Sequence, residues 1–236
     1  MLDAYCRMGG SSAGYVAAGA RVIGVDKKDC SDGYAGHEFV QGDAIAFIRR
    51  YGHLFSLIHT GPPCQGQIRI TKANRKRDGW TDKHVNLIPD TRAALDDVGV
   101  PYVIENGPSE HLRSDVELCG LMFGLPLLRH RAFELGGWSA TQPEHPGALN
   151  HPGELTIGWR HGCLRTIEPT TCPLHRRWCR GTVYGVYGKG GGKPSVPDAQ
   201  RALGIHWMDD IDDLNEAIPP AYTSWLGREF VMGVSV

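Results

Sequence analysis

Residues 1–26 read MLDAYCRMGGSSAGYVAAGARVIGVD, and this stretch decides the fold class. The glycine pair Gly9 and Gly10 lies between a predicted first strand and a helix expected over residues 12–18. A second strand, predicted at residues 22–25, leads into Asp26. Glycines let a backbone approach a nucleotide, and an acid at the end of the second strand can bind both ribose hydroxyls. The stretch therefore predicts a nucleotide-binding βαβ unit.

Strand and helix patterns continue to alternate along the rest of the chain. Further strands are expected at residues 39–41, 54–59 and 102–104, and further helices at residues 44–50, 89–98 and 222–232. The last helix follows Pro219 and Pro220, which act as a start signal. This alternation predicts an α/β fold with a mostly parallel sheet flanked by helices.

The periodic pattern is interrupted over residues 138–197, which are rich in Pro, Gly, His and Cys. Periodic sequence returns at Asp198. We therefore predict a catalytic domain built from residues 1–137 and 198–236, with residues 138–197 as a small irregular inserted lobe.

Composition limits the class of protein. The chain has 236 residues, of which 41% are apolar, so it can bury a core. It has no apolar stretch of about 18 residues and no signal peptide, so we expect a cytoplasmic protein without a membrane partner, by default a monomer. Seven cysteines in such a chain indicate thiols or a metal site rather than a disulfide framework.

Charge is clustered although the net charge is only -1. One basic run spans residues 69–77, a second lies within residues 160–180, and acids gather within residues 209–216. A solvated surface explains most runs of this kind, so each basic run alone is weak evidence for a polyanionic partner.

Asp43 ends the sequence Val-Gln-Gly-Asp after the strand expected at residues 39–41. It could accept a hydrogen bond from the amine of an adenine, and a role as a helix N-cap is compatible with this. Together with the glycine turn and Asp26 it favours an adenosine cofactor. The absence of a GxxxxGK[ST] sequence after the first strand argues against ATP hydrolysis.

Cys64 follows the strand expected at residues 54–59, in the sequence Gly-Pro-Pro-Cys-Gln-Gly. The two prolines fix the backbone, so the thiol is presented from a rigid strand end. Most isolated cysteines are buried small hydrophobes. A cysteine in a polar turn can instead be exposed as a reactive thiolate.

These motifs, in this order, resemble those of the DNA (cytosine-5) methyltransferases, in particular the compact phage-type members. Pro-Cys-Gln at residues 63–65 is similar to the nucleophile motif of that family, and LDAYCRMGG at residues 2–10 to its first motif. YVIENG at residues 102–107 resembles its Glu-Asn-Val motif, LRHRAF at 128–133 its Arg-x-Arg, and AIPPAYTSWLG at 217–227 its last motif. Two departures are Gly107, where valine is usual, and Arg7 with Met8, where small residues are common.

The resemblance implies a Rossmann-like S-adenosylmethionine-dependent methyltransferase fold and a covalent mechanism. Cys64 would add to carbon 6 of a cytosine, whose carbon 5 then takes the methyl group. Glu105, with a raised pKa, would protonate ring nitrogen 3. Arg131 would contact the ring carbonyl with support from Arg129, unless the two form only a surface pair on a strand. The implied S-adenosylmethionine site consists of Tyr5, Gly9, Gly10, Asp26, Asp43, Pro62 and Tyr222.

The expected partner is double-stranded DNA, from which the target base must be rotated out of the stack. The side chains predicted to contact the nucleic acid are Gln65, Arg69, Arg75, Lys76, Arg77, Arg176 and Arg177. Because residues 138–197 are few, we expect recognition of a short or degenerate sequence context. Two alternatives are a methyltransferase acting on transfer RNA and a non-enzymatic DNA-binding relative. Intact Cys64, Glu105 and Arg131 argue against the second.

The inserted lobe contains a group that resembles half of a zinc site. The sequence Cys-x2-His-x3-Cys provides three of its residues, and a further cysteine precedes it with eight residues between. Zinc could stabilise a lobe that has little core, but the first spacing is not diagnostic, so partly buried thiols are the favoured interpretation. The four residues are Cys163, Cys172, His175 and Cys179.

Overall fold

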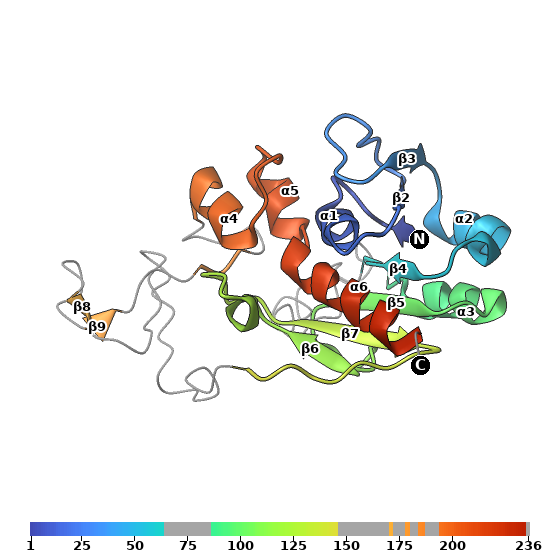
Figure 1. Ribbon diagram of the computed structural model, residues 1–236. Helices are drawn as coiled ribbons and strands as arrows, with labels where there is room; N and C mark the ends of the chain where they lie inside the picture. Colours follow the sequence, from blue (N-terminus) through green and yellow to red (C-terminus); the bar gives the residue numbers. More distant parts are fainter. Residues whose placement is uncertain (64–85, 146–169, 172–177, 180–183, 187–193, 235–236) are drawn as a thin grey trace, which may run out of the picture.

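The computed structural model describes residues 1–63, 86–145, 170–171, 178–179, 184–186 and 194–234. Its centre is a seven-stranded sheet with the strand order β3-β2-β1-β4-β5-β7-β6 (Figure 1). These strands are β1 (Leu2–Ala4), β2 (Ile23–Asp26), β3 (Glu38–Gln41), β4 (Ile58–Thr60), β5 (Tyr102–Asn106), β6 (Val116–Leu118) and β7 (Arg131–Gly136). A separate antiparallel pair joins β8 (Thr170–Thr171) to β9 (Trp178–Cys179).

The sheet is mostly parallel. Strands β3, β2, β1, β4 and β5 all run in the same direction, and Leu2 in β1 pairs with Ile23 on one side and Ile58 on the other. At the far edge, β7 runs antiparallel to both β5 and β6. The predicted mostly parallel sheet is confirmed, and the antiparallel edge is a feature that the alternating pattern did not indicate.

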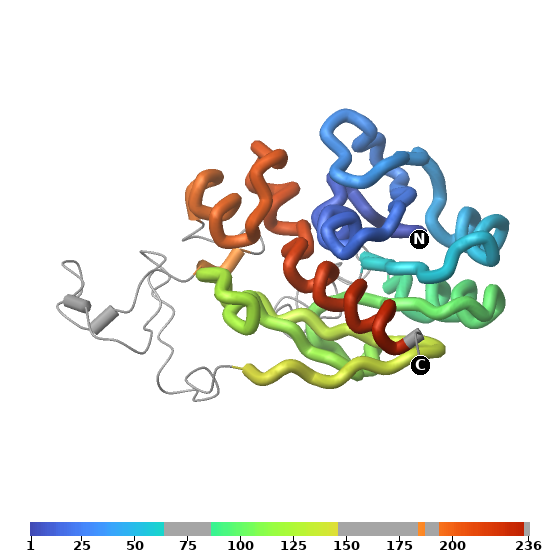
Figure 2. The backbone as a smooth tube through the Cα atoms, in the orientation of Figure 1, coloured from blue at the N-terminus to red at the C-terminus, as the bar shows by residue number. Residues whose placement is uncertain are grey.

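Helices cover both faces of the sheet. They are α1 (Gly10–Ala17), α2 (Ala44–Tyr51), α3 (Ile88–Val98), α4 (Val196–Leu203), α5 (Ile211–Glu216) and α6 (Pro220–Val234). Side chains of α2 and α3 share a core cluster with Ile104, whereas side chains of α1 and α6 share another with Val103. Successive residues of a strand point to opposite faces, so the two helix pairs lie on opposite sides. Figure 2 shows the red α6 beside the blue α1.

Local sequence signals explain where several helices begin. Asp43 caps α2, because its side chain accepts a hydrogen bond from the backbone N–H of Ala46 at 2.9 Å. Ser195 caps α4 in the same way through the N–H of Asp198. Helix α6 begins at Pro220, in agreement with the double proline as a start signal. None of the helices in the described ranges has the length and apolar character needed to cross a bilayer.

The helix expected at residues 12–18 packs tightly against the end of the chain. A Cβ atom placed on Gly14 would lie 2.0 Å from Oγ1 of Thr223 in α6. Gly14 therefore permits contact between α1 and α6, rather than an approach of the backbone to a ligand.

The prediction of a strand over residues 54–59 is wrong at its start. Gly52–Leu54 forms a short 3-10 helix (η1), and β4 begins only at Ile58. The side chain of Leu54 is 69% exposed. Apolar residues are present both in the turn between α2 and β4 and in β4 itself. The sequence therefore gives no signal that separates the turn from the strand.

The two ends of the predicted inserted lobe pack on the main body. Nε1 of Trp138 donates a hydrogen bond to the carbonyl of Tyr102 at 3.0 Å, and its ring contacts Phe230 of α6. Tyr184 and Val186 join a third core cluster with residues of α4 and the segment that follows it. The division of the chain into a catalytic domain and a lobe stays a prediction.

Candidate active site

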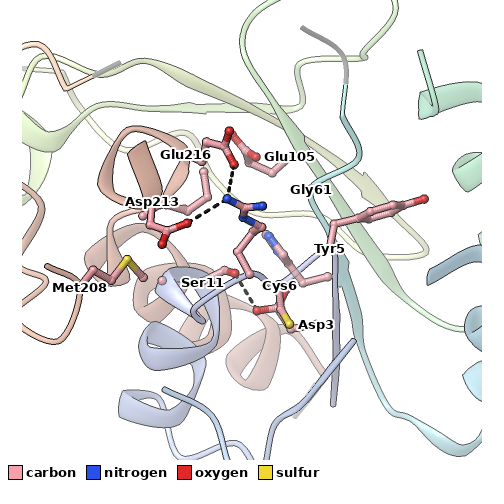
Figure 3. Close-up of a pocket in the computed structure, with 14 residues that line it drawn as sticks. Asp3, Tyr5, Cys6, Ser11, Gly61, Glu105, Met208, Asp213 and Glu216 are labelled. Carbon is pink, nitrogen blue, oxygen red and sulfur yellow. Dashed lines mark hydrogen bonds and ion pairs between the residues drawn. The ribbon is translucent and has the colours of Figure 1, made fainter. Parts of the chain in front are cut away.

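The carboxyl ends of the parallel neighbours β1, β4 and β5 lie side by side, at the end of the sheet where these strands finish. The strand order reverses between β1 and β4, and ligands of open α/β sheets bind at such a switch point. A pocket lies there, lined by residues of the β1–α1 turn, the ends of β4 and β5, and α5 (Figure 3). Tyr5, Gly10, Gly61 and Glu105 are among its lining residues.

Glu105 is a buried carboxyl in this pocket, and it pairs with Arg131. Nε of Arg131 lies 2.9 Å from Oε1 of Glu105, and the two residues belong to the neighbouring strands β7 and β5. Burial raises the pKa of Glu105, while the nearby Arg131 and Arg129 act to lower it. Burial has the larger effect, so Glu105 holds its proton at a higher pH than an exposed glutamate does.

Glu105 also lies beside the turn that leads to Cys64. A Cβ atom added to Gly61 would be 3.5 Å from Oε2 of Glu105. The next residue in β5, Asn106, donates from Nδ2 to the carbonyl of Pro62 at 2.7 Å. Strand β5 therefore holds the turn before Cys64. Cys64 itself lies outside the described residues, as do Gln65, Arg69, Arg75, Lys76 and Arg77.

The predicted ribose acid lies at the end of β2. Asp26 is buried, and its two carboxylate oxygens accept backbone hydrogen bonds from Arg7 at 3.0 Å and Lys28 at 2.9 Å. Gly9, at the start of α1, has a φ of 80°, a conformation that favours glycine. The turn and the acid are thus joined by a direct hydrogen bond.

Two further predicted cofactor residues, Tyr5 and Asp43, have defined partners. Tyr5 lines the pocket, and its hydroxyl lies 2.9 Å from Oγ1 of Thr91. Asp43 caps α2 and forms an ion pair with Lys27 at 2.9 Å. The backbone N–H of Ala46 is the main cause of its lowered pKa. The N-cap role of Asp43 is confirmed, and its contact with an adenine stays a prediction.

Two solved structures have the same architecture. A mutant of the DNMT2 protein of Spodoptera frugiperda is 12% identical, with a TM-score of 0.57 over 95% of this chain and 97% of that one. The Dnmt2 methyltransferase of S. pombe is 14% identical, with a TM-score of 0.55 over 100% and 98%. This chain has a Dnmt2-like methyltransferase fold. The expected Rossmann-like fold is thereby confirmed, whereas no family model and no curated protein sequence matches the chain.

The pocket of this Dnmt2-like fold contains a buried acid that the motifs did not single out. Asp3, in β1, accepts hydrogen bonds at Oδ2 from the hydroxyls of Ser11 and Ser12, the former at 2.6 Å. Its Oδ1 is buried and has no hydrogen-bond partner among the described residues. Burial raises the pKa of Asp3 to about 6. The sequence signal that could have identified Asp3 is an acid in the first strand together with the Ser-Ser pair that follows Gly9 and Gly10.

Arg7 connects the glycine turn to α5. Its Nη2 lies 2.9 Å from Asp213 and 3.0 Å from Glu216. Dashed lines in Figure 3 mark the ion pairs that end on Asp213 and Glu216. Asp213 also pairs with Lys28 at 3.3 Å, and Asp210 caps α5. Asp213 and Glu216 are therefore ion-paired in the fold, because the chain folds back and brings α5 to Arg7 in the β1–α1 turn.

His59 is a second buried group that lines the pocket. Its Nδ1 lies 3.0 Å from the hydroxyl of Tyr15, and the two rings meet edge to face. Burial lowers the pKa of His59 to about 3, so the ring is neutral at physiological pH.

Arg129 and Tyr222 form a buried cross-link. Arg129 is 2% exposed and donates to the carbonyls of Val186 and Asn215, the latter at 2.8 Å. The interpretation of Arg129 and Arg131 as a surface pair is wrong. The hydroxyl of Tyr222 donates to the carbonyl of Arg129 at 2.6 Å, and Tyr222 is fully buried. Tyr222 thus packs the core behind the pocket, and the structure does not support its assignment to the cofactor site.

The remaining predicted residues belong to the inserted lobe. Cys163, Cys172, His175, Arg176 and Arg177 lie outside the described residues. Cys179 belongs to β9, of which only the backbone is described. The predicted zinc group in the lobe stays a prediction.

Proposed function

We propose that this chain is an S-adenosylmethionine-dependent methyltransferase that methylates carbon 5 of cytosine in DNA, with Cys64 as the nucleophile. One observation carries the proposal. The buried pair of Glu105 and Arg131 lies beside the Gly61–Pro62 turn, which leads directly to Cys64. An acid with a raised pKa and a cation, placed beside the turn that precedes a cysteine in the sequence, match the requirements of this reaction.

Each of these three groups has a distinct part in the chemistry. The Cys64 thiolate forms a bond to carbon 6, and the displaced electron pair makes carbon 5 nucleophilic. Glu105 donates its proton, or a hydrogen bond, to ring nitrogen 3 as charge develops there. Arg131 holds the neighbouring carbonyl oxygen. After methyl transfer, loss of the carbon 5 proton returns electrons to the ring and expels the thiolate.

Residues of the pocket and of the neighbouring strand and helix ends fit the cofactor. S-adenosylmethionine, when bound, supplies an electrophilic methyl group on a positively charged sulfur. Asp26 would hold the ribose hydroxyls and Asp43 the adenine amine, while the buried Oδ1 of Asp3 offers an unused acceptor for an ammonium group. Arg7 supplies a cation for a carboxylate, beside four acids that also line the pocket: Asp3, Glu105, Asp213 and Glu216.

DNA is the favoured polymer on sequence grounds. The compact last motif and the short insertion at residues 138–197 resemble those of the phage-type DNA methyltransferases. The basic residues at 69–77 and 176–177 would bind phosphates, so binding should weaken steeply as salt concentration rises.

The test is a methyl-transfer assay with isotopically labelled S-adenosylmethionine on two polymers, double-stranded DNA and transfer RNA, followed by mapping of 5-methylcytosine at base resolution. We expect transfer to DNA in a context of one or two defined base pairs. A Cys64→Ala variant should be inactive, whereas Cys30→Ala, at a buried cysteine that does not line the pocket, should keep activity.

Methyl transfer to transfer RNA alone would show that the substrate is RNA and not DNA. Methylation confined to a motif of five or more base pairs would contradict the predicted short context. Absence of transfer to either polymer would favour a non-enzymatic relative.

A further inference from the structure

A group of metal-ligating side chains lies at the edge of the sheet, away from the pocket. Cys119, His130 and His145 each offer one ligand atom, and these atoms all lie within 4.8 Å of one another. The three residues come from separate segments. Cys119 follows β6, His130 immediately precedes β7, and His145 lies in the chain after β7. The fold therefore gathers residues that no short sequence motif connects.

Cys119 offers a buried sulfur at the start of the 3-10 helix η5 (Gly120–Phe123). Its thiol donates a hydrogen bond to the carbonyl of Leu127 at 3.8 Å. A metal ion beside the sulfur would displace the thiol proton, because the thiolate is the form that binds metals.

The two histidines are arranged as a pair. The rings of His130 and His145 are stacked, with centroids 5.3 Å apart and planes 14° from parallel. His130 is partly buried, and a neutral imidazole has a ring nitrogen whose lone pair can bind a metal. The charge of Glu117 acts on both Cys119 and His130, which places a negative group close to the cluster.

The segment that carries His145 is anchored to the sheet. The side chain of Gln142 accepts a hydrogen bond from the backbone N–H of Glu117 at 2.8 Å and donates to its carbonyl at 2.8 Å. Glu117 is the middle residue of β6, the edge strand of the sheet. These two bonds hold the chain near Cys119, so His145 is brought to the cluster by a fixed backbone.

We propose that Cys119, His130 and His145 bind one Zn²⁺ ion. Thiolate and imidazole are ligands that zinc prefers, and Zn–S and Zn–N bonds of about 2.3 and 2.0 Å put tetrahedral ligand atoms about 3.3 to 3.6 Å apart. Small side-chain rotations close the separation from 4.8 Å. A water molecule takes the fourth position. One thiolate and two neutral imidazoles leave a net charge of +1 on the site, which the nearby Glu117 offsets.

The ion would join three segments around the start of β7. His130 lies between Arg129 and Arg131, so zinc would fix the backbone that positions both arginines. This site is separate from the group predicted at Cys163, Cys172, His175 and Cys179 in the lobe, and it does not depend on the proposed function.

The experiment measures metal content and spectra of the full-length chain. Zinc bound per chain is determined by elemental analysis, and Co²⁺ is then substituted to reveal ligand type. We expect a thiolate-to-cobalt charge-transfer band in the wild type. Cys119→Ser and His145→Ala should each remove one equivalent of metal, and they should abolish the rise in melting temperature that added zinc causes in the wild type.

Two controls separate metal binding from folding and from the lobe. His53→Ala, at an exposed histidine, should keep the full metal content. A double variant with Cys172→Ser and Cys179→Ser should also keep it, because the proposed zinc site does not use these cysteines of the lobe. His145→Cys replaces one ligand by another, so it should still bind Co²⁺ and show a stronger charge-transfer band from two thiolates. This variant keeps the test valid even if Cys119→Ser or His145→Ala fails to fold. Unchanged metal content in Cys119→Ser and His145→Ala, or a wild-type cobalt spectrum without a thiolate band, would overturn the proposal.

Discussion

Nε of Arg131 lies 2.9 Å from Oε1 of Glu105 across the antiparallel β5–β7 pair, and the glutamate side chain is only 8% exposed. The approach makes an ion pair rather than an aligned hydrogen bond, because Oε1 has no hydrogen-bond partner among the described residues. Glu105 therefore keeps hydrogen-bonding capacity for a ligand while Arg131 fixes its position.

Replacing Glu105 with glutamine should lower turnover by about 100-fold or more, the usual contribution of general acid catalysis. Because proton donation requires the protonated acid, wild-type turnover limited by this step should fall as pH rises through the raised pKa of Glu105. The glutamine variant should lack that dependence. Turnover and its pH profile are measured at saturating S-adenosylmethionine.

Glu134→Gln is the matched control for this variant. Glu134 is equally buried in the neighbouring strand, but it pairs with Arg92 and Arg113 and does not line the pocket. Its loss should reduce stability without changing turnover per folded molecule. Equal turnover in wild type and Glu105→Gln would exclude Glu105 as the acid.

Asp3 should make stability depend on pH. Burial raises its pKa from 3.8 to about 6, so the folded state favours the protonated form. The contribution of Asp3 to the free energy of unfolding is therefore greatest below pH 3.8, and it declines by about 3 kcal/mol as pH rises through about 6. His59 has the opposite effect, because its depressed pKa costs stability as pH falls from 6.5 towards 3.

Asp3→Asn removes the first of these two effects. Relative to the variant, the wild type should lose unfolding free energy between pH 4 and 7 in urea titrations. Asp97→Asn, at an exposed position of α3, serves as the control and should track the wild type. Parallel curves for wild type and Asp3→Asn would show that Asp3 ionises normally in the fold.

The two roles assigned to Asp43 can be separated by substitution. Serine can still cap α2 but lacks a carboxylate. Alanine lacks both the capping oxygen and the carboxylate, and loss of the cap costs about 1 kcal/mol of stability. We expect Asp43→Ser to keep the melting temperature and to bind S-adenosylmethionine more weakly. Asp26→Ala should weaken binding by about 1 to 3 kcal/mol, since a buried partner is left unpaired. Calorimetry with unchanged affinity in both variants would rule out this cofactor site.

Local sequence signals predicted much of the parallel half of the fold. The glycine pair, Asp26 and the double proline mark element ends that the structure reproduces. Periodicity did not indicate β6 or the antiparallel direction of β7, because both depend on pairing between distant segments.

The candidate site was predicted to the extent that its residues belong to motifs. Glu105 and Arg131 meet as expected. The contact of Arg7 with Asp213 joins residues that are far apart in the sequence. From the sequence alone, Arg7 is therefore noted only as a departure from a motif, and Asp213 only as part of a charged run. Tyr222 belongs to a motif as well, yet the packing of α6 buries it away from the pocket.

Covalent trapping tests most directly whether Cys64 is the nucleophile. Duplex DNA that contains 5-fluorocytosine blocks the final proton loss, so the adduct between enzyme and carbon 6 should accumulate in the presence of S-adenosylmethionine. We predict that mass spectrometry of the digested complex finds the modified nucleotide on Cys64, and that Cys64→Ala gives no adduct while it still binds the cofactor. An adduct on another residue, or methylated DNA produced without any covalent intermediate, would contradict the account.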